Sequence, residues 1–148
     1  MTFKIETNKT KEEILRIILN NTKIQESIFD LQSNGEYFRG SVGEDSFKIQ
    51  RCIGYRNSFL PVIIGTIQNE NEKNVINIEM RLNSFVKGFV IFWLSFVILF
   101  CIMTPLIELE IPYRFIPHLI LIFGILLFTI PFEIEAKIAR EKLEAILK

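Results

Sequence analysis

The sequence predicts an α+β membrane protein. It would have a small cytoplasmic antiparallel sheet of about four to five strands, two N-terminal helices, a two-helix transmembrane hairpin and a C-terminal amphipathic helix packing back on the cytoplasmic domain. Three observations predict this class. Two long apolar runs, 89–107 and 115–132, contain no Asp, Glu, Lys or Arg. The segment before them changes from helical to alternating hydrophobic spacing, and the segment after them is amphipathic.

The two apolar runs are long enough to cross a bilayer. At about 1.5 Å per helical residue, each run approaches the hydrocarbon thickness of roughly 30 Å. The chain therefore divides into a cytoplasmic α+β domain (1–85), a transmembrane hairpin (86–132) and a cytoplasmic amphipathic helix (133–148). The 88 residues before the first run suffice for one small domain.

The N-terminal segment predicts a short strand over 3–6 and then two helices. Thr10 and Glu13 fit a capping box, and isoleucines at helical spacing follow, so we expect a helix over 11–19. Thr22 and Gln25 fit a second box and open an expected helix over 22–31, which Asn34-Gly35 would end.

Alternating hydrophobic residues then predict four strands, over 38–42, 47–53, 59–67 and 76–82. The third is apolar on both faces, which is typical of a covered strand, although Pro61 favours an edge or a bulge there. The fourth strand leads almost directly into the first apolar run.

The C-terminal segment predicts a helix with one apolar face. Pro131 precedes it and predicts a bend at the inner end of the second run. An apolar stripe of this kind requires a partner surface, and the open face of the sheet is the nearest one. The stripe consists of Ala136, Ala139, Leu143, Ile146 and Leu147.

The basic residues predict that both termini lie in the cytoplasm. The loop between the two runs contains Arg114 alone, whereas Lys and Arg flank the other ends of both runs. The flanking residues are Lys73, Arg81, Lys87, Lys137, Arg140, Lys142 and Lys148. The first residues lack the apolar core of a signal peptide, so we expect the first run to act as the insertion signal.

Several classes of function find little support in the composition. A net charge of zero gives no electrostatic footprint for nucleic acid. His118 is the only histidine, so a zinc site has no second imidazole, and Cys52 and Cys101 fall in different compartments. Glu108 and Glu110 are expected to be solvated loop acids. We therefore expect no enzymatic activity, no metal and no cofactor.

The segment 51–61 is the strongest candidate for ligand binding. It joins two apolar strands yet contains Arg51, Tyr55, Arg56 and Asn57. The arginines could hold an anionic lipid headgroup or a phosphate, and the segment as a whole could contact a protein partner. The alternative is structural: Arg51 caps the end of the domain, and 56–58 form a turn that satisfies its own backbone.

The same residues carry a resemblance. The patterns Phe38-x-Gly40-x-Val42, Phe47-x-Ile49-x-Arg51 and Tyr55-Arg-Asn-Ser-Phe-x-Pro61-x-Ile63-x-Gly65, followed by a strand and two spans, resemble a group of small bacterial two-span membrane proteins. That group has an N-terminal α+β domain and no assigned activity. The resemblance implies a multi-pass protein of the bacterial inner membrane and transfers no catalytic residue.

Two functional hypotheses follow from the sequence. The first is a membrane-anchored binding or scaffold module, whose cytoplasmic domain contacts a protein or a lipid headgroup. The second is a small transport or channel component, which requires a homo-oligomer because two helices cannot enclose a pathway. The spans are poor in the small and polar residues that line pores, the exceptions being Ser95, Thr104, Gly124 and Thr129.

Overall fold

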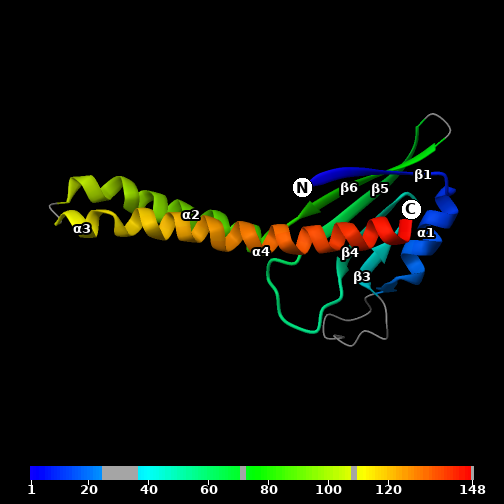
Figure 1. Ribbon diagram of the computed structural model, residues 1–148, viewed down its shortest axis with the longest axis horizontal. Helices are drawn as coiled ribbons and strands as arrows, with labels where there is room; N and C mark the ends of the chain where they lie inside the picture. The colour runs from blue at the N-terminus through cyan, green and yellow to red at the C-terminus, as the bar shows by residue number, and fades with distance from the viewer. Residues whose placement is uncertain (25–36, 71–72, 108–109, 148) are drawn as a thin grey trace.

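The computed structural model describes residues 1–24, 37–70, 73–107 and 110–147. An α+β domain lies at one end of the molecule, and a pair of long helices extends from it (Figure 1). One of those helices, α4, continues into the domain and crosses the sheet. The α+β class and the two long apolar helices expected from the sequence are confirmed, whereas the strand count and the helix details differ.

The sheet has six strands in the order β1-β6-β5-β4-β3-β2. All neighbouring strands are antiparallel except β2 and β3, which are parallel, so the sheet is mixed and larger than the four or five antiparallel strands expected. The strands are β1 (Thr2–Thr7), β2 (Thr22–Ile24), β3 (Phe38–Val42), β4 (Ser46–Arg51), β5 (Val62–Glu70) and β6 (Lys73–Arg81).

The prediction of a second N-terminal helix is wrong for the residues that the structure describes. Thr22–Ile24 form β2 beside β3, and the rest of the expected helix, with Asn34-Gly35, lies outside the described residues. Two of these three residues are β-branched, and pairing with β3 satisfies backbone groups that the edge of the sheet would expose. The local capping pattern at Thr22 was outweighed by this pairing.

The first helix matches its expectation. Helix α1 (Lys11–Asn20) begins at Thr10, whose hydroxyl accepts from the Glu13 amide while the Glu13 carboxylate accepts from the Thr10 amide. Both halves of the capping box are therefore present. Its buried residues, Ile14 and Ile18, are one helical turn apart and face the sheet core.

Strand β5 begins later than the sequence predicts. The amide of Phe59 donates to the Asn57 side chain, and Pro61 has no amide to donate, so ladder pairing starts only at Val62. Beyond that point β5 and β6 form the longest antiparallel pair in the described sheet. Gly65 in β5 lies under the Phe47 ring, and a Cβ there would be 2.1 Å from that ring.

One face of the sheet carries the core. Alternate residues of five strands point to it, and α1 and the C-terminal part of α4 pack over it (Figure 1). The opposite face is more polar, with residues such as Lys48, Thr66 and Glu79 exposed, although Ile64 and the buried Val75 also lie on it. The largest fully buried side chains are those of Phe38, Phe47, Ile5, Ile14, Ile18, Ile49, Ile63, Ile76, Ile78, Met80, Leu143 and Leu147.

Helix α4 (Ile116–Leu147) is one uninterrupted helix, so Pro131 lies inside it and does not end it. Its C-terminal part packs back on the sheet as expected, because Ala136, Ala139, Leu143 and Leu147 are fully buried in the core. The end of the helix is fixed to β1, since the Thr7 hydroxyl donates to the Leu147 carbonyl at 3.1 Å.

The two apolar helices lie against each other along their length (Figure 1). Helix α2 (Ser84–Met103) begins at Asn83 and continues into the 3-10 helix η1 (Thr104–Leu106), and a short helix α3 (Ile111–Arg114) precedes α4. Trp93 of α2 packs on Gly124 of α4, where a Cβ would be 2.1 Å from the indole. We call α2, η1, α3 and α4 as far as Pro131 the apolar hairpin.

Candidate functional site

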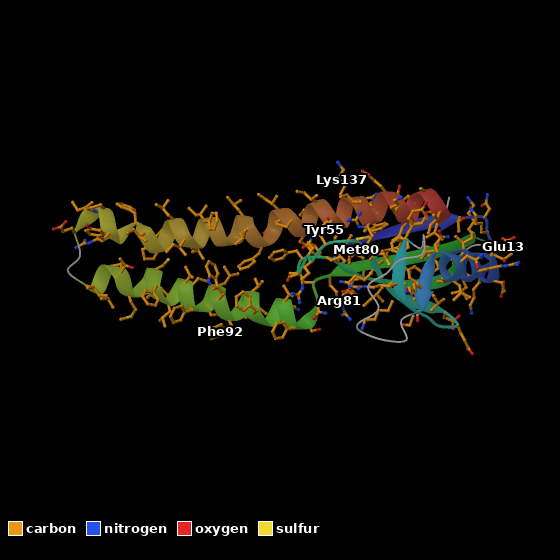
Figure 2. All side chains as sticks on the ribbon, turned by 90° about the horizontal axis from the view of Figure 1, so that it is seen from below. Glu13, Tyr55, Met80, Arg81, Phe92 and Lys137 are labelled. Carbon is orange, nitrogen blue, oxygen red and sulfur yellow. The ribbon has the colours of Figure 1, made fainter. Side chains whose placement is uncertain are left out.

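Residues 52–61 leave the end of β4 and lie against α4, close to the base of the apolar hairpin. Phe59 contacts Phe128 of α4 with ring centroids 5.9 Å apart, and Phe128 also contacts Trp93 at 5.4 Å. Figure 2 shows Tyr55 beside α4 at this end of the domain. The segment that the sequence singled out therefore lies where the domain, α4 and the hairpin meet.

A buried carboxylate, that of Glu135, lies at the centre of this junction. Its side chain is 5% exposed and receives hydrogen bonds from three side chains of β4 and the following loop. Arg51 Nη2 lies 2.5 Å from Oε2, while Tyr55 Oη and Asn57 Nδ2 lie 2.8 Å and 2.9 Å from Oε1. We call these four residues the Glu135 cluster.

The local sequence explains how the cluster assembles. Arg51 is the last residue of β4 and shares the inner face of that strand with Phe47 and Ile49. Glu135 lies one turn before Ala139 on the buried face of α4. Both charges thus point into the interface between sheet and helix, where an ion is stable only when it is paired and hydrogen-bonded.

Asn57 has a second role in ordering the loop. Its side-chain Oδ1 accepts from the Phe59 amide at 2.9 Å, as in an Asx turn. Gln50 of β4 then donates to the Leu60 carbonyl at 3.0 Å, and Leu60 is buried. The loop therefore satisfies part of its own backbone, in agreement with the structural alternative weighed for 56–58.

The structure brings together three of the four residues predicted to bind a ligand. Arg51, Tyr55 and Asn57 all contact Glu135, so the anion that they meet in this chain is one of its own carboxylates. Arg56 is exposed, and none of the hydrogen bonds to Glu135 comes from it. Binding of an external ligand by these residues stays a prediction.

Sequence reasoning missed Glu135, the residue on which the others converge. The signal was its helical spacing, because Glu135 is four residues before Ala139 and eight before Leu143, both on the apolar stripe. An acid on such a stripe indicates a buried partner of opposite charge. Arg51 is that partner: it occupies an inward-facing position of β4, where the alternation of the strand would place an apolar residue.

The Glu135 cluster joins β4 and the loop that follows it to helix α4. Both oxygens of Glu135 are engaged, and Arg51 is 16% exposed, so the ion pair is shielded from water. The hydrogen bond to Glu135, and then burial, raise the pKa of the Tyr55 hydroxyl above its ordinary value near 10. The hydroxyl therefore stays protonated and acts as a donor.

We expect Tyr55→Phe to lower the melting temperature at neutral pH, because one donor to Glu135 is lost. Since the folded-state pKa of Tyr55 is raised, its contribution is complete below its ordinary pKa and is lost as pH rises through the higher folded value. The difference in melting temperature between wild type and variant should therefore shrink above about pH 10. A difference that stayed constant from pH 7 to the alkaline limit would contradict this assignment. Thermal melts followed by circular dichroism at several pH values provide the measurement.

The remaining candidate residues do not form a site in the described part of the chain. His118 is exposed, with Nδ1 3.2 Å from the Arg114 carbonyl of the preceding turn. Glu110 is exposed, and Glu108 lies outside the described residues. Within 1–24, 37–70, 73–107 and 110–147, no three His, Cys, Asp or Glu side chains are grouped as metal ligands would be.

Comparison of the chain with protein-family models, with curated proteins and with solved structures found no match.

Proposed function

We propose that this protein is a two-span inner-membrane protein whose α+β domain is a binding or scaffold module held at the cytoplasmic leaflet. The observation that carries the proposal is the continuity of α4, which passes from the apolar hairpin into the core of the domain without a break. A domain attached in this way keeps a fixed position and orientation relative to the hairpin. That arrangement suits presentation of a surface close to a bilayer.

The exposure of the hairpin supports a lipid environment. Two helices are long and apolar enough to cross a membrane, and only 11% and 6% of their most apolar windows are buried. A core helix of a soluble protein would be mostly covered. Here large side chains such as Phe92 (70% exposed) and Phe123 (64% exposed) form a continuous apolar surface, which soluble monomers rarely expose.

The distribution of basic residues supports the cytoplasmic orientation. Arg81 and Lys87 adjoin the start of α2, and Lys137 follows the span in α4, whereas the connecting loop contains Arg114. Lys73, which the sequence placed among the flanking residues, lies instead at the start of β6, at the opposite end of the strand from Arg81. It does not contribute to the charge beside the hairpin.

The transport or channel alternative receives less support from the packing. Within one chain the hairpin is closed by Trp93 on Gly124, and the indole fills the space between the helices. Thr104 donates to the Phe100 carbonyl, and Ser95 to the Ile91 carbonyl, within their own helix. A pathway would therefore need several copies. A single-chain mass of 17.3 kDa in detergent, measured by light scattering, would exclude this alternative.

Two measurements test the membrane placement. The protein should remain in the membrane fraction after alkaline carbonate extraction. In a Cys52→Ser/Cys101→Ser background, a cysteine at Tyr113 should react with a membrane-impermeant maleimide in intact cells. A cysteine at Lys48 should react only after the cells are permeabilised. Extraction by carbonate, or the reverse labelling pattern, would contradict the proposal.

A further inference from the structure

Four basic residues from four separate segments lie around the base of the apolar hairpin. Arg56 belongs to the loop of the Glu135 cluster, Arg81 ends β6, Lys87 lies in the first turn of α2, and Lys137 lies on α4. All four are exposed. We call them the basic collar. Figure 2 shows Arg81 and Lys137 at the end of the domain from which the hairpin leaves.

The contacts of neighbouring residues set the level of the collar. Tyr55 and Asn57 both bind Glu135, so Arg56 between them is held next to α4 just beyond Pro131. Arg81 is two residues from Asn83, which caps α2. Lys137 is six residues past Pro131, or about 9 Å at the helical rise. The interfacial layer adds about 5–7 Å to each side of the hydrocarbon core, so these side chains reach it.

Exposed acids lie at both ends of the domain. Among the described residues near the collar, Glu135 is engaged by Arg51, whereas Glu79 is exposed near Arg81 and Glu133 and Glu141 lie beside Lys137. The opposite end of the domain, where α1 begins and β3 turns into β4, carries the larger set of exposed acids (Glu13 in Figure 2). That set comprises Glu6, Glu12, Glu13, Glu44 and Asp45.

We propose that the basic collar binds the headgroups of anionic phospholipids in the cytoplasmic leaflet. Guanidinium and ammonium groups attract lipid phosphates, and the attraction acts within a Debye length of roughly 8–10 Å at physiological salt. The collar lies within that distance of the headgroups in the proposed orientation. This inference rests on the proposed membrane placement, since the hairpin is what brings the collar to the leaflet.

A lipid is favoured over a soluble acidic protein because of geometry. Arg81 and Lys137 lie on opposite sides of the base of the hairpin (Figure 2), and Lys87 is itself part of the helix that enters the bilayer in the proposed orientation. The leaflet therefore meets all four residues without any further association, whereas a soluble partner could reach only one side of the collar.

The experiment measures which lipids surround the protein. Wild type carrying Ser58→Cys in the Cys52→Ser/Cys101→Ser background is labelled with a donor fluorophore. It is then reconstituted into vesicles of equal phosphatidylcholine and phosphatidylglycerol. Energy transfer is compared between trace acceptor-labelled phosphatidylglycerol and trace acceptor-labelled phosphatidylcholine. We expect transfer to the anionic lipid to be higher by about twofold, because each basic residue near the surface adds attraction.

A charge-matched pair of variants identifies the residues responsible. Arg56→Gln/Arg81→Gln/Lys137→Gln should abolish the preference, while Arg16→Gln/Lys48→Gln/Lys73→Gln, which removes the same charge from exposed positions elsewhere, should retain it. Lys87 is kept because it helps to set the orientation of the span. In the unmutated collar, raising the salt from about 0.1 M to about 1 M should remove the preference without any effect on folding.

Equal energy transfer to the two labelled lipids, in a correctly inserted wild type, would overturn the inference. The collar would then be assigned to an acidic soluble partner. An equal loss of preference in both triple variants would also overturn it. Failure of the wild type to resist carbonate extraction would instead contradict the membrane placement, so the two failures are distinguishable.

Discussion

Glu135→Ala should lower the free energy of unfolding by about 3 kcal/mol, because it leaves the Arg51 charge in a shielded site without its partner. Tyr55 and Asn57 lose the same acceptor. Arg51 Nε already has no hydrogen-bond partner among the described residues, so the guanidinium has no alternative contact to strengthen. For a domain of this size the expected fall in melting temperature is about 10–20 °C.

The matched control is Glu133→Ala, two residues earlier on the same helix and exposed. It should change the free energy of unfolding by no more than about 0.5 kcal/mol. Both variants are measured in the same detergent by circular dichroism. Equal melting temperatures for the two variants would show that the Glu135 cluster does not stabilise the junction.

A double variant tests whether the junction requires the charges of Arg51 and Glu135. Arg51→Met/Glu135→Leu removes both charges and keeps apolar volume, so it should recover most of the stability lost in Glu135→Ala. Recovery would show that a neutral, well-packed pair can replace the ion pair, so that the junction does not require the two charges themselves. No recovery would indicate that Glu135 acts chiefly through Tyr55 and Asn57.

Leu143→Ala should lower the free energy of unfolding by about 2–5 kcal/mol, since Leu143 is fully buried between α4 and the sheet and its truncation leaves a cavity. The effect is also expected to extend beyond the site of the substitution. The C-terminal part of α4 supplies one cover of the sheet core, so a defect in it is felt by β1, β4, β5 and β6 together.

Glu141→Ala, on the exposed side of the same turn, should leave the melting temperature within about 2 °C of wild type. Hydrogen exchange of β6 amides is the sharper readout, because those amides should lose protection in Leu143→Ala alone. Retained protection of β6 in Leu143→Ala would contradict the assignment of α4 to the core.

The parts of the fold that sequence reasoning anticipated depend on local signals. The charge-free runs predict the two apolar helices, and the Thr10–Glu13 box with its isoleucine spacing predicts α1, because each pattern is complete within a few turns of chain. The stripe of Ala136, Ala139 and Leu143 likewise predicts that α4 packs on the sheet. None of these inferences needs knowledge of a distant partner.

The parts that it missed depend on distant partners. Residues 22–24 resemble a helix start, and only the edge of β3, reached through 25–37, makes them a strand. Glu135 and Arg51 are 84 residues apart, and neither position shows locally that the other neutralises it.

In the proposed membrane orientation, the continuous helix α4 would couple the hairpin mechanically to the domain. Its 32 residues extend over about 48 Å, and its midpoint lies close to Pro131, between the apolar half and the half that packs on the sheet. A bilayer that becomes thinner favours a greater inclination of its helices, and a change of about 10° around the midpoint would swing the domain's end by about 4 Å. With the hairpin in a bilayer as proposed, the position of the sheet relative to the leaflet would therefore respond to the thickness of that bilayer.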